Sequence, residues 1–368
     1  MRMVFRWFGE GNDSVHLSQM KQIPGVEGVV WALHDLPPGE VWPLERIQQV
    51  KQYANNYGFH TEVVESVNIH ETIKLGSDER DYYIDNYIQT IKHLATIGVK
   101  VICYNFMPVF DWIRTDLYGK LPDESSALFY EKDKVEDMDP LALVEKIAAN
   151  PDYTMPGWEP ERLATLKDLF EAYKDVSQTD LMNNLQYFLE RVIPVCEEHD
   201  VKLALHPDDP PWEIFNLPRI VTTQQKIREI LQLHPSKYHG LTLCSGALGV
   251  RPDNNIPEMI YEFKERIHFA HIRNVKVFNN GDFIETSHRT KDGTLPMDDI
   301  VKAYHDIGYK GYVRPDHGRH IWDEECRPGY GLYDRALGIM YIWGLWDAYN
   351  NLQGKEDYIV AHTFKSKE

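Results

Sequence analysis

A β-strand that ends in a polar turn is predicted for Gly311-Tyr-Val-Arg-Pro-Asp-His-Gly-Arg319. The turn places Asp316 beside His317, with an arginine on either side. A carboxylate next to an imidazole can combine a metal ligand with a proton-transfer group. Taken alone, the pattern fits an ordinary polar turn equally well. Three earlier strands end in a similar way, and this repetition favours a metal site over an ordinary turn.

Short apolar strands alternate with amphipathic stretches along most of the chain. The strands are predicted at Met3–Phe8, Gly28–Leu33, His60–Glu65, Val99–Phe106, Val201–His206, Gly240–Cys244, Ile267–Arg273 and Tyr312–Asp316. Each is followed by a helical pattern, and this count is typical of a TIM barrel. The competing fold, a doubly wound open sheet, usually shows a glycine-rich dinucleotide turn after its first strand, and none is present. We therefore expect an α/β protein with a single (β/α)8 TIM-barrel domain spanning residues 1–368.

One long segment interrupts the alternation after the fourth predicted strand. It covers residues 107–179, is rich in Pro, Asp and aromatic residues, and contains two predicted helices, Asp139–Ala149 and Pro160–Tyr173. A segment this long between regular units is usually a lid or a binding element. We expect it to lie over the mouth of the active site. A shorter excursion, Asn274–Gly293, is predicted to be a loop or a hairpin.

Composition and charge exclude several partners and compartments. The formal net charge is −18, so no overall basic surface is available for a phosphate backbone, and we expect no nucleic-acid partner. The first eight residues are too short and too charged for a signal peptide, and no apolar run approaches the length of a membrane span. The 4 cysteines are scattered without CxxC spacing, which fits a reducing cytoplasm.

Four consecutive predicted strands, the fifth to the eighth, end in residues that bind divalent metals. In chain order these residues are His206, Cys244, His271 and Asp316. Because chemistry in a barrel takes place at the C-terminal ends of the strands, we expect them along one arc of the rim. Each alone fits a structural or buried residue. Together they indicate a metal site with open positions, and the softness of the thiolate favours Zn²⁺ or Fe²⁺.

Residues around this arc suit an acidic sugar. Arg273 follows His271 by two residues on the same face of the strand, so it could clamp a carboxylate. Arg314 and Arg319 flank Asp316, and we expect one of them to form a structural salt bridge. Further candidates for the pocket are Trp7, Asn105, His288 and the phenol of Tyr330.

Several long blocks of sequence resemble the D-mannonate dehydratase family, which shares its fold with xylose-isomerase-like barrels. The matching blocks are Phe5-Arg-Trp7, Cys103-Tyr-Asn-Phe-Met-Pro-Val-Phe-Asp-Trp112, His206-Pro-Asp-Asp-Pro-Pro211, Phe269-Ala-His-Ile-Arg-Asn274, Arg314-Pro-Asp-His-Gly-Arg319 and Pro328-Gly-Tyr-Gly-Leu-Tyr-Asp-Arg-Ala-Leu-Gly338. The resemblance therefore runs essentially from end to end.

This resemblance implies dehydration of D-mannonate to 2-dehydro-3-deoxy-D-gluconate in hexuronate (glucuronate) breakdown. It implies Mn²⁺ as the usual metal, with Fe²⁺ also accepted, and the ligands His206, Cys244, His271 and Asp316. The acid–base pair falls on His317 and Tyr330, and Arg273 would stabilise the charge that develops on the substrate. We expect His317 to protonate the leaving hydroxyl and Tyr330 to act as the base or to assist it. The choice of Mn²⁺ rests on the resemblance.

Two alternatives stay open. A metal-dependent sugar isomerase or epimerase can use the same barrel, although such sites tend to be rich in carboxylates. A non-catalytic sugar-acid-binding protein would hold a structural metal in a closed site, whereas the neighbouring His317 and Arg273 favour an open one. The aromatic residues of the last predicted helix fit either a core or an interface, and slightly favour a homodimer. Those aromatic residues are Tyr341, Trp343, Trp346 and Tyr349.

Overall fold

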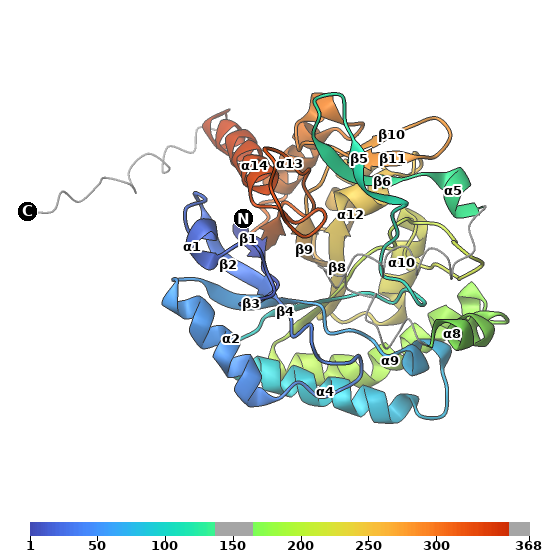
Figure 1. Ribbon diagram of the computed structural model, residues 1–368. Helices are drawn as coiled ribbons and strands as arrows, with labels where there is room; N and C mark the ends of the chain where they lie inside the picture. Colours follow the sequence, from blue (N-terminus) through green and yellow to red (C-terminus); the bar gives the residue numbers. More distant parts are fainter. Residues whose placement is uncertain (137–164, 353–368) are drawn as a thin grey trace, which may run out of the picture.

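The computed structural model describes residues 1–136 and 165–352 of the chain. Eight parallel strands close into a barrel in which neighbours in the chain are also neighbours in space (Figure 1). The barrel strands are β1 (Arg2–Arg6), β2 (Val26–Trp31), β3 (His60–Glu65), β4 (Val101–Tyr104), β7 (Lys202–Leu205), β8 (His239–Cys244), β9 (Ile267–His271) and β12 (Tyr312–Arg314). The predicted TIM barrel is thus confirmed, with each predicted strand within a few residues of an observed one.

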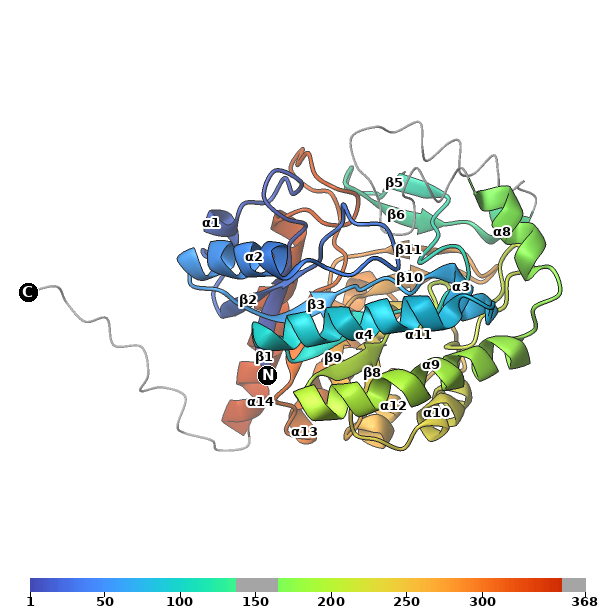
Figure 2. The ribbon, with the colours of Figure 1, turned by 90° about the horizontal axis from the view of Figure 1, so that it is seen from below.

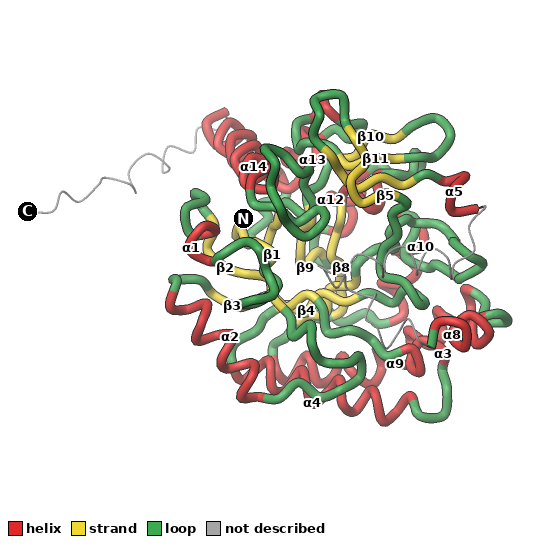
Figure 3. The backbone as a smooth tube through the Cα atoms, viewed as in Figure 1, coloured by secondary structure: helices red, strands yellow, loops and turns green. Residues whose placement is uncertain are grey.

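Helices cover the outside of the barrel, as the tube drawing shows (Figure 3). The longer helices are α2 (Leu44–Asn56), α4 (Arg80–Thr96), α8 (Leu166–Tyr173), α9 (Gln178–His199), α10 (Gln224–Leu233), α12 (Ile256–Phe263), α13 (Met297–Asp306) and α14 (Tyr333–Leu352). The shorter ones are α1 (Leu17–Met20), α3 (Glu71–Leu75), α5 (Lys132–Glu136) and α11 (Ser245–Gly249). Among the described residues, no helix is long and apolar enough to span a bilayer.

The hydrophobic core has two layers, separated by the barrel wall. Successive residues of a strand face opposite sides, so in β1 Val4 faces the barrel interior while Met3 and Phe5 pack against the helices. The interior layer consists of Val4, Val30, Val63, Val101, Cys103, Ala204, Phe269 and Tyr312. Burial on both faces explains why the strands appear in the sequence as nearly continuous apolar runs.

A second, antiparallel sheet, here called the capping sheet, lies beside the barrel (Figure 2). Two of its strands, β5 (Asp116–Lys120) and β6 (Ser126–Tyr130), belong to the long segment after β4. The other two, β10 (Val275–Val277) and β11 (Phe283–Glu285), follow β9. The hairpin predicted within residues 274–293 is therefore confirmed. The strands β5 and β6 were not predicted within the long segment, and β6 pairs with β11, a strand far away in the sequence.

The rest of the long segment is only partly described. Helix α8 occupies the end of the predicted helix Pro160–Tyr173, whereas the predicted helix Asp139–Ala149 lies outside the described residues. Met107, Asp111 and Trp112, at the beginning of the segment, line the cavity at the barrel mouth. The beginning of the segment thus forms part of the cavity wall.

Candidate active site

A cavity lies where the barrel strands end. Its lining is dominated by charged and polar side chains. These include the arginines Arg6, Arg273 and Arg314, the acids Glu65, Asp111, Asp209 and Asp316, and the histidines His206 and His317. A cavity of this polarity suits a small, hydrophilic and charged ligand.

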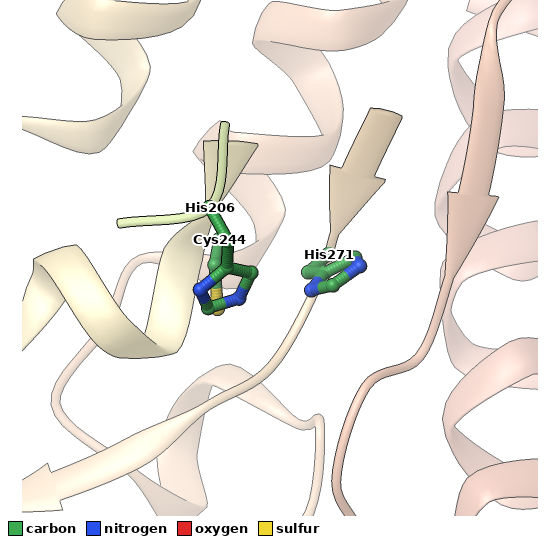
Figure 4. Close-up of side chains that lie close together, drawn as sticks. All are labelled: His206, Cys244 and His271. Carbon is green, nitrogen blue, oxygen red and sulfur yellow. The ribbon is translucent and has the colours of Figure 1, made fainter. Parts of the chain in front are cut away.

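Three of the predicted metal-binding residues come together at the ends of neighbouring strands. His206 follows β7, Cys244 ends β8 and His271 ends β9, and their donor atoms lie within 4.8 Å of one another. Figure 4 shows the two imidazoles and the sulfur in this arrangement. Nδ1 of His206 lies 2.7 Å from the carbonyl oxygen of Pro207. Because a carbonyl can only accept, Nδ1 carries the hydrogen and Nε2 is left with a lone pair for a ligand.

Asp316, the fourth predicted ligand, lies at the edge of this group. Its Oδ2 is 3.3 Å from Sγ of Cys244, and its Oδ1 is 3.9 Å from Nδ1 of His271. Its backbone has a φ of 52°, an uncommon conformation for a residue with a side chain. Burial alone would raise the pKa of Asp316, but the nearby cations, Arg314 first among them, outweigh burial and hold the pKa well below its usual value. The carboxylate is therefore ionised and able to bind a cation.

The donor set fits a divalent metal ion. Burial raises the pKa of the Cys244 thiol well above its usual value, and the charge of Asp316 acts in the same direction. A cation bound beside the sulfur would reverse this effect and favour the thiolate. Two imidazoles, one thiolate and one carboxylate are a common combination for transition metals. The same His271 also lies near Glu65 and Cys103, whose donor atoms form a second group of this kind.

Next to the metal-binding group, His317 connects two side chains that can exchange protons. Its Nε2 lies 2.9 Å from the phenol oxygen of Tyr330, and its Nδ1 lies 2.8 Å from Oε1 of Glu285. The ring of Tyr330 packs edge-on against Phe8, with the ring centroids 4.8 Å apart. Burial raises the pKa of Tyr330, so its phenol stays protonated in the free protein. The expected acid–base pair is therefore in direct contact.

Arg273, predicted to clamp a substrate carboxylate, forms ion pairs within the protein. Arg273 does line the cavity, but its guanidinium group already faces protein carboxylates. Nη2 lies 2.8 Å from Asp209 and Nη1 lies 3.1 Å from Glu285. Arg314 is a second candidate for this role. It pairs with Glu65 at 2.7 Å and with Asp316 at 2.9 Å, and its Nη1, like Nε of Arg273, is buried without a hydrogen-bond partner in the described part of the chain.

Two further residues predicted to bind substrate do not line this cavity. Trp7 stacks on Tyr53, with ring centroids 5.6 Å apart, and does not line the cavity. Arg6 points into the cavity, and because side chains alternate along a strand its neighbour Trp7 faces the other way. His288 is buried, with Nε2 2.9 Å from the carbonyl of Ile272 and 2.6 Å from that of Pro315. It holds two loops together and takes no part in lining the cavity.

Of the two remaining predicted residues, Asn105 lies in the cavity wall and Arg319 lies outside it. Asn105 lines the cavity, and its side-chain oxygen accepts a hydrogen bond from the backbone of Met107. Arg319 forms ion pairs with Asp334 and Asp123, both outside the cavity. Arg319 is thus the structural member of the two arginines that flank Asp316.

Sequence reasoning missed four charged residues of the site. They are Asp111, Arg114, Asp209 and Glu285. Asp209 belongs to a polar stretch that directly follows a predicted ligand, and this is a signal that could have identified it. Glu285 interrupts the apolar run Phe283-Ile-Glu-Thr286, where a carboxylate needs a buried partner. Nothing in the sequence indicates the partners themselves.

A closed (β/α)8 barrel whose strand ends combine possible metal ligands with an acid–base pair defines a barrel enzyme acting on a small polar substrate. The family model described as D-mannonate dehydratase matches residues 1–356. The chain belongs to the D-mannonate dehydratase family.

Individual relatives agree with this assignment. The chain is 67% identical over 357 residues to mannonate dehydratase 1 of Halalkalibacterium halodurans, covering 97% of this chain and 99% of that protein. It is 55% identical over 356 residues to mannonate dehydratase of Bacillus subtilis, covering 97% and 99%. The crystal structure of mannonate dehydratase from Streptococcus suis serotype 2 matches with a TM-score of 0.87 at 41% identity, covering 96% of each chain. A xylose isomerase domain protein from Planctomyces limnophilus shares the fold alone, with a TM-score of 0.54 at 11% identity over 96% of this chain and 99% of that one.

Proposed function

We propose that this enzyme dehydrates D-mannonate to 2-dehydro-3-deoxy-D-gluconate and water, as a step of hexuronate breakdown. Family membership over nearly the whole chain carries the proposal and favours it over an isomerase, an epimerase or a binding protein. The contact between His317 and Tyr330 beside the metal-binding group supplies the acid–base chemistry that an elimination needs.

The reaction removes one proton and one hydroxide from the substrate. A base takes the proton from C2, and its electron pair forms the C2–C3 double bond. The C3–O bond breaks, and the leaving hydroxyl takes up a proton and departs as water. The resulting enol becomes the 2-keto acid when a proton moves from the C2 hydroxyl to C3. The enzyme must therefore provide one base and one acid on the two reacting carbons.

His317 and Tyr330 can fill these two roles as a pair. A phenol that stays protonated can act as a base only if its own proton leaves at the same time. Nε2 of His317 lies 2.9 Å from that oxygen and can receive the proton. His317 would then deliver it to the leaving hydroxyl, while Tyr330 keeps the proton taken from C2. This assignment makes Tyr330 the base and His317 the acid.

We further propose Mn²⁺ as the metal, with Fe²⁺ also accepted, held by His206, Cys244, His271 and Asp316. When bound, the cation supplies positive charge that stabilises the negative charge developing on the substrate carboxylate as the C2 proton leaves. The unpartnered Nη1 of Arg314 supports a role in binding the same carboxylate. The polar cavity wall at Asn105 would then face the hydroxyl groups of the substrate.

A metal-dependent assay tests the proposed function. The protein is stripped with a chelator, Mn²⁺, Fe²⁺ or Zn²⁺ is added back, and formation of the 2-keto-3-deoxy acid from D-mannonate is followed. Product that appears only with metal, and not with Cys244→Ala, is the expected result. Tight metal binding without any product from D-mannonate would overturn the dehydratase assignment and leave the metal site standing.

Assembly and location remain predictions. The aromatic residues first considered for an interface are largely engaged within the protein. Tyr341 contacts Thr290, Tyr349 donates to the carbonyl of Asp298, and Trp346 is buried against His305. We nevertheless retain the homodimer as a proposal that light scattering can test. We also retain a cytoplasmic location, which fractionation of the source cells would test.

A further inference from the structure

Four buried charged side chains form a closed ring of alternating sign beside His317. Arg114 binds both oxygens of Asp209, at 2.8 and 3.1 Å, and lies 2.9 Å from Oε1 of Glu285. Arg273 closes the ring with contacts of 2.8 Å to Asp209 and 3.1 Å to Glu285. These side chains are at most 3% exposed. Two acids balance two arginines, so the ring is neutral by itself.

Glu285 is the member of this ring that also contacts His317 as an acceptor. Its Oε1 lies 2.8 Å from Nδ1. The carboxylate of Asp316 is 3.8 Å from Nε2, beyond hydrogen-bond distance. Within the described residues, Glu285 is therefore the carboxylate to which His317 can donate a hydrogen bond.

A second contact of Nδ1 means that the hydrogen of His317 can lie on either of its two ring nitrogens. Nη1 of Arg273 also lies 2.8 Å from Nδ1 of His317. An arginine N–H cannot accept, so Nδ1 either donates to Glu285 or accepts from Arg273. In the first arrangement Nε2 is an acceptor and receives the phenol hydrogen of Tyr330. In the second, Nε2 carries the hydrogen and cannot take a proton from Tyr330.

We propose that Glu285 is a positioning residue that holds His317 in the tautomer with its hydrogen on Nδ1, so that Nε2 faces Tyr330 as an acceptor. Donation to a carboxylate is a charge-assisted hydrogen bond, which favours this tautomer over acceptance from Arg273. Nη1 of Arg273 keeps Glu285 as an alternative acceptor, so it loses no hydrogen bond. The inference rests on the acid–base roles proposed above for His317 and Tyr330.

The capping sheet is what places Glu285 at this position. Glu285 ends β11, and this strand is held between β10 and β6. Arg114 comes from the chain just before β5, so both hairpins contribute to the ring. The capping sheet therefore orients a group of the active site.

Kinetic comparison of Glu285→Gln with Glu285→Asp tests the inference, with Glu71→Gln as a matched control. Glu71 is also a buried glutamate, but its carboxylate binds Lys74 at 2.8 Å and the phenol of Tyr173 at 2.6 Å, and neither of these partners lines the cavity. We expect kcat of Glu285→Gln to fall by about 10²-fold or more with a KM within about threefold, as for other losses of a tautomer-fixing carboxylate. Glu71→Gln should lower stability and leave kcat close to that of the wild type.

Glu285→Asp separates positioning from simple charge balance. This variant keeps the negative charge but withdraws the carboxylate by about 1.5 Å, the length of one C–C bond. Positioning predicts that kcat stays low, because the contact with Nδ1 is lost. Recovery of kcat to within about threefold of the wild type would overturn the proposal in favour of charge balance.

The tautomer itself can be measured without any turnover. In protein labelled with ¹⁵N-histidine, the signals of His317 are those that disappear in His317→Asn. We expect a protonated Nδ1 and an unprotonated Nε2 in the wild type, and a shift toward the other tautomer in Glu285→Gln. The same tautomer in both proteins would overturn the inference. If the wild type made no product from D-mannonate, the proposed function would fail, while this spectrum would still decide the tautomer.

Discussion

The phenol oxygen of Tyr330 lies 2.9 Å from Nε2 of His317, close enough to transfer a proton without an intervening water. Tyr330→Phe removes this oxygen alone. We expect kcat to fall by about 10²- to 10⁴-fold, the usual contribution of a positioned acid or base. The melting temperature should change little, because the ring still packs against Phe8. A variant with near-normal kcat would remove Tyr330 from the mechanism.

Metal binding should stabilise the fold through Cys244. A metal at about 100 times its Kd adds about 2.7 kcal/mol to the free energy of unfolding. Thermal melting with and without Mn²⁺ should show this shift for the wild type but not for Cys244→Ala. Cys196→Ala is the control, because Cys196 is equally buried but lies in α9, away from the site. A shift that persisted in Cys244→Ala would mean that the metal binds elsewhere.

His288→Leu should impair stability and spare substrate binding. The substitution leaves the carbonyls of Ile272 and Pro315 without their buried donor, which costs about 1–3 kcal/mol. Urea unfolding measures this loss. With saturating metal, KM for D-mannonate should stay within about twofold of the wild type. An increase in KM at unchanged stability would instead place His288 at the substrate.

Asp111 should contribute to substrate binding. It is 8% exposed and lines the cavity, and within the described residues it has neither an ion pair nor a hydrogen bond. Its charge would repel a carboxylate, so we expect it to accept hydrogen bonds from substrate hydroxyls. Asp111→Ala should then lower kcat/KM for D-mannonate by about 10- to 100-fold, mostly through KM. Unchanged kinetics in Asp111→Ala would show that the substrate does not reach this wall.

Stability should decrease in weak acid because of two buried histidines far from the cavity. Burial lowers the pKa of both His239 and His268 to about 3. Both ionise near pH 6.5 in the unfolded chain. The unfolded state therefore binds more protons between these two values, and the free energy of unfolding falls as pH decreases through this range. Each histidine contributes a slope of up to about 1.4 kcal/mol per pH unit.

Urea unfolding at about pH 7 and about pH 5 measures this slope. His239→Gln removes one of the two titrating groups and retains a donor for the carbonyl of Ile230. The free energy of unfolding of this variant should depend less steeply on pH than that of the wild type, by up to about 1.4 kcal/mol per pH unit. Identical slopes would show that His239 is not held neutral in the folded protein.

Local patterns made the barrel and the metal-binding group predictable. Each barrel strand is a short apolar run followed by a helical pattern, and the ends of such strands face one rim whatever the other details are. His206, Cys244 and His271 come together for this reason alone. Trp7 lies outside the cavity because proximity to a strand end does not determine the side of the barrel wall that a side chain faces.

The remainder of the site depends on pairing between distant segments. Ser126–Tyr130 is an apolar run that could have been recognised as a strand, but its partner β11 could not be deduced from it. The partners of Arg273 were equally inaccessible, because Asp209 approaches it from the loop after β7 and Glu285 from the end of β11. Ion pairs of this kind become visible only when the chain is folded.

The two hairpins of the capping sheet depend on each other for their structure. Phe283 pairs with Tyr130 and Ile284 with Phe129, so each hairpin satisfies the backbone of the other. Consider a chimera that takes the β5–β6 hairpin from a distant homologue and retains its own β10–β11 hairpin. Its β6 and β11 would come from different proteins, so their side chains would not be matched to each other. Recombination, natural or engineered, should therefore succeed only when both hairpins are exchanged at once, although a large part of the barrel separates them in the gene.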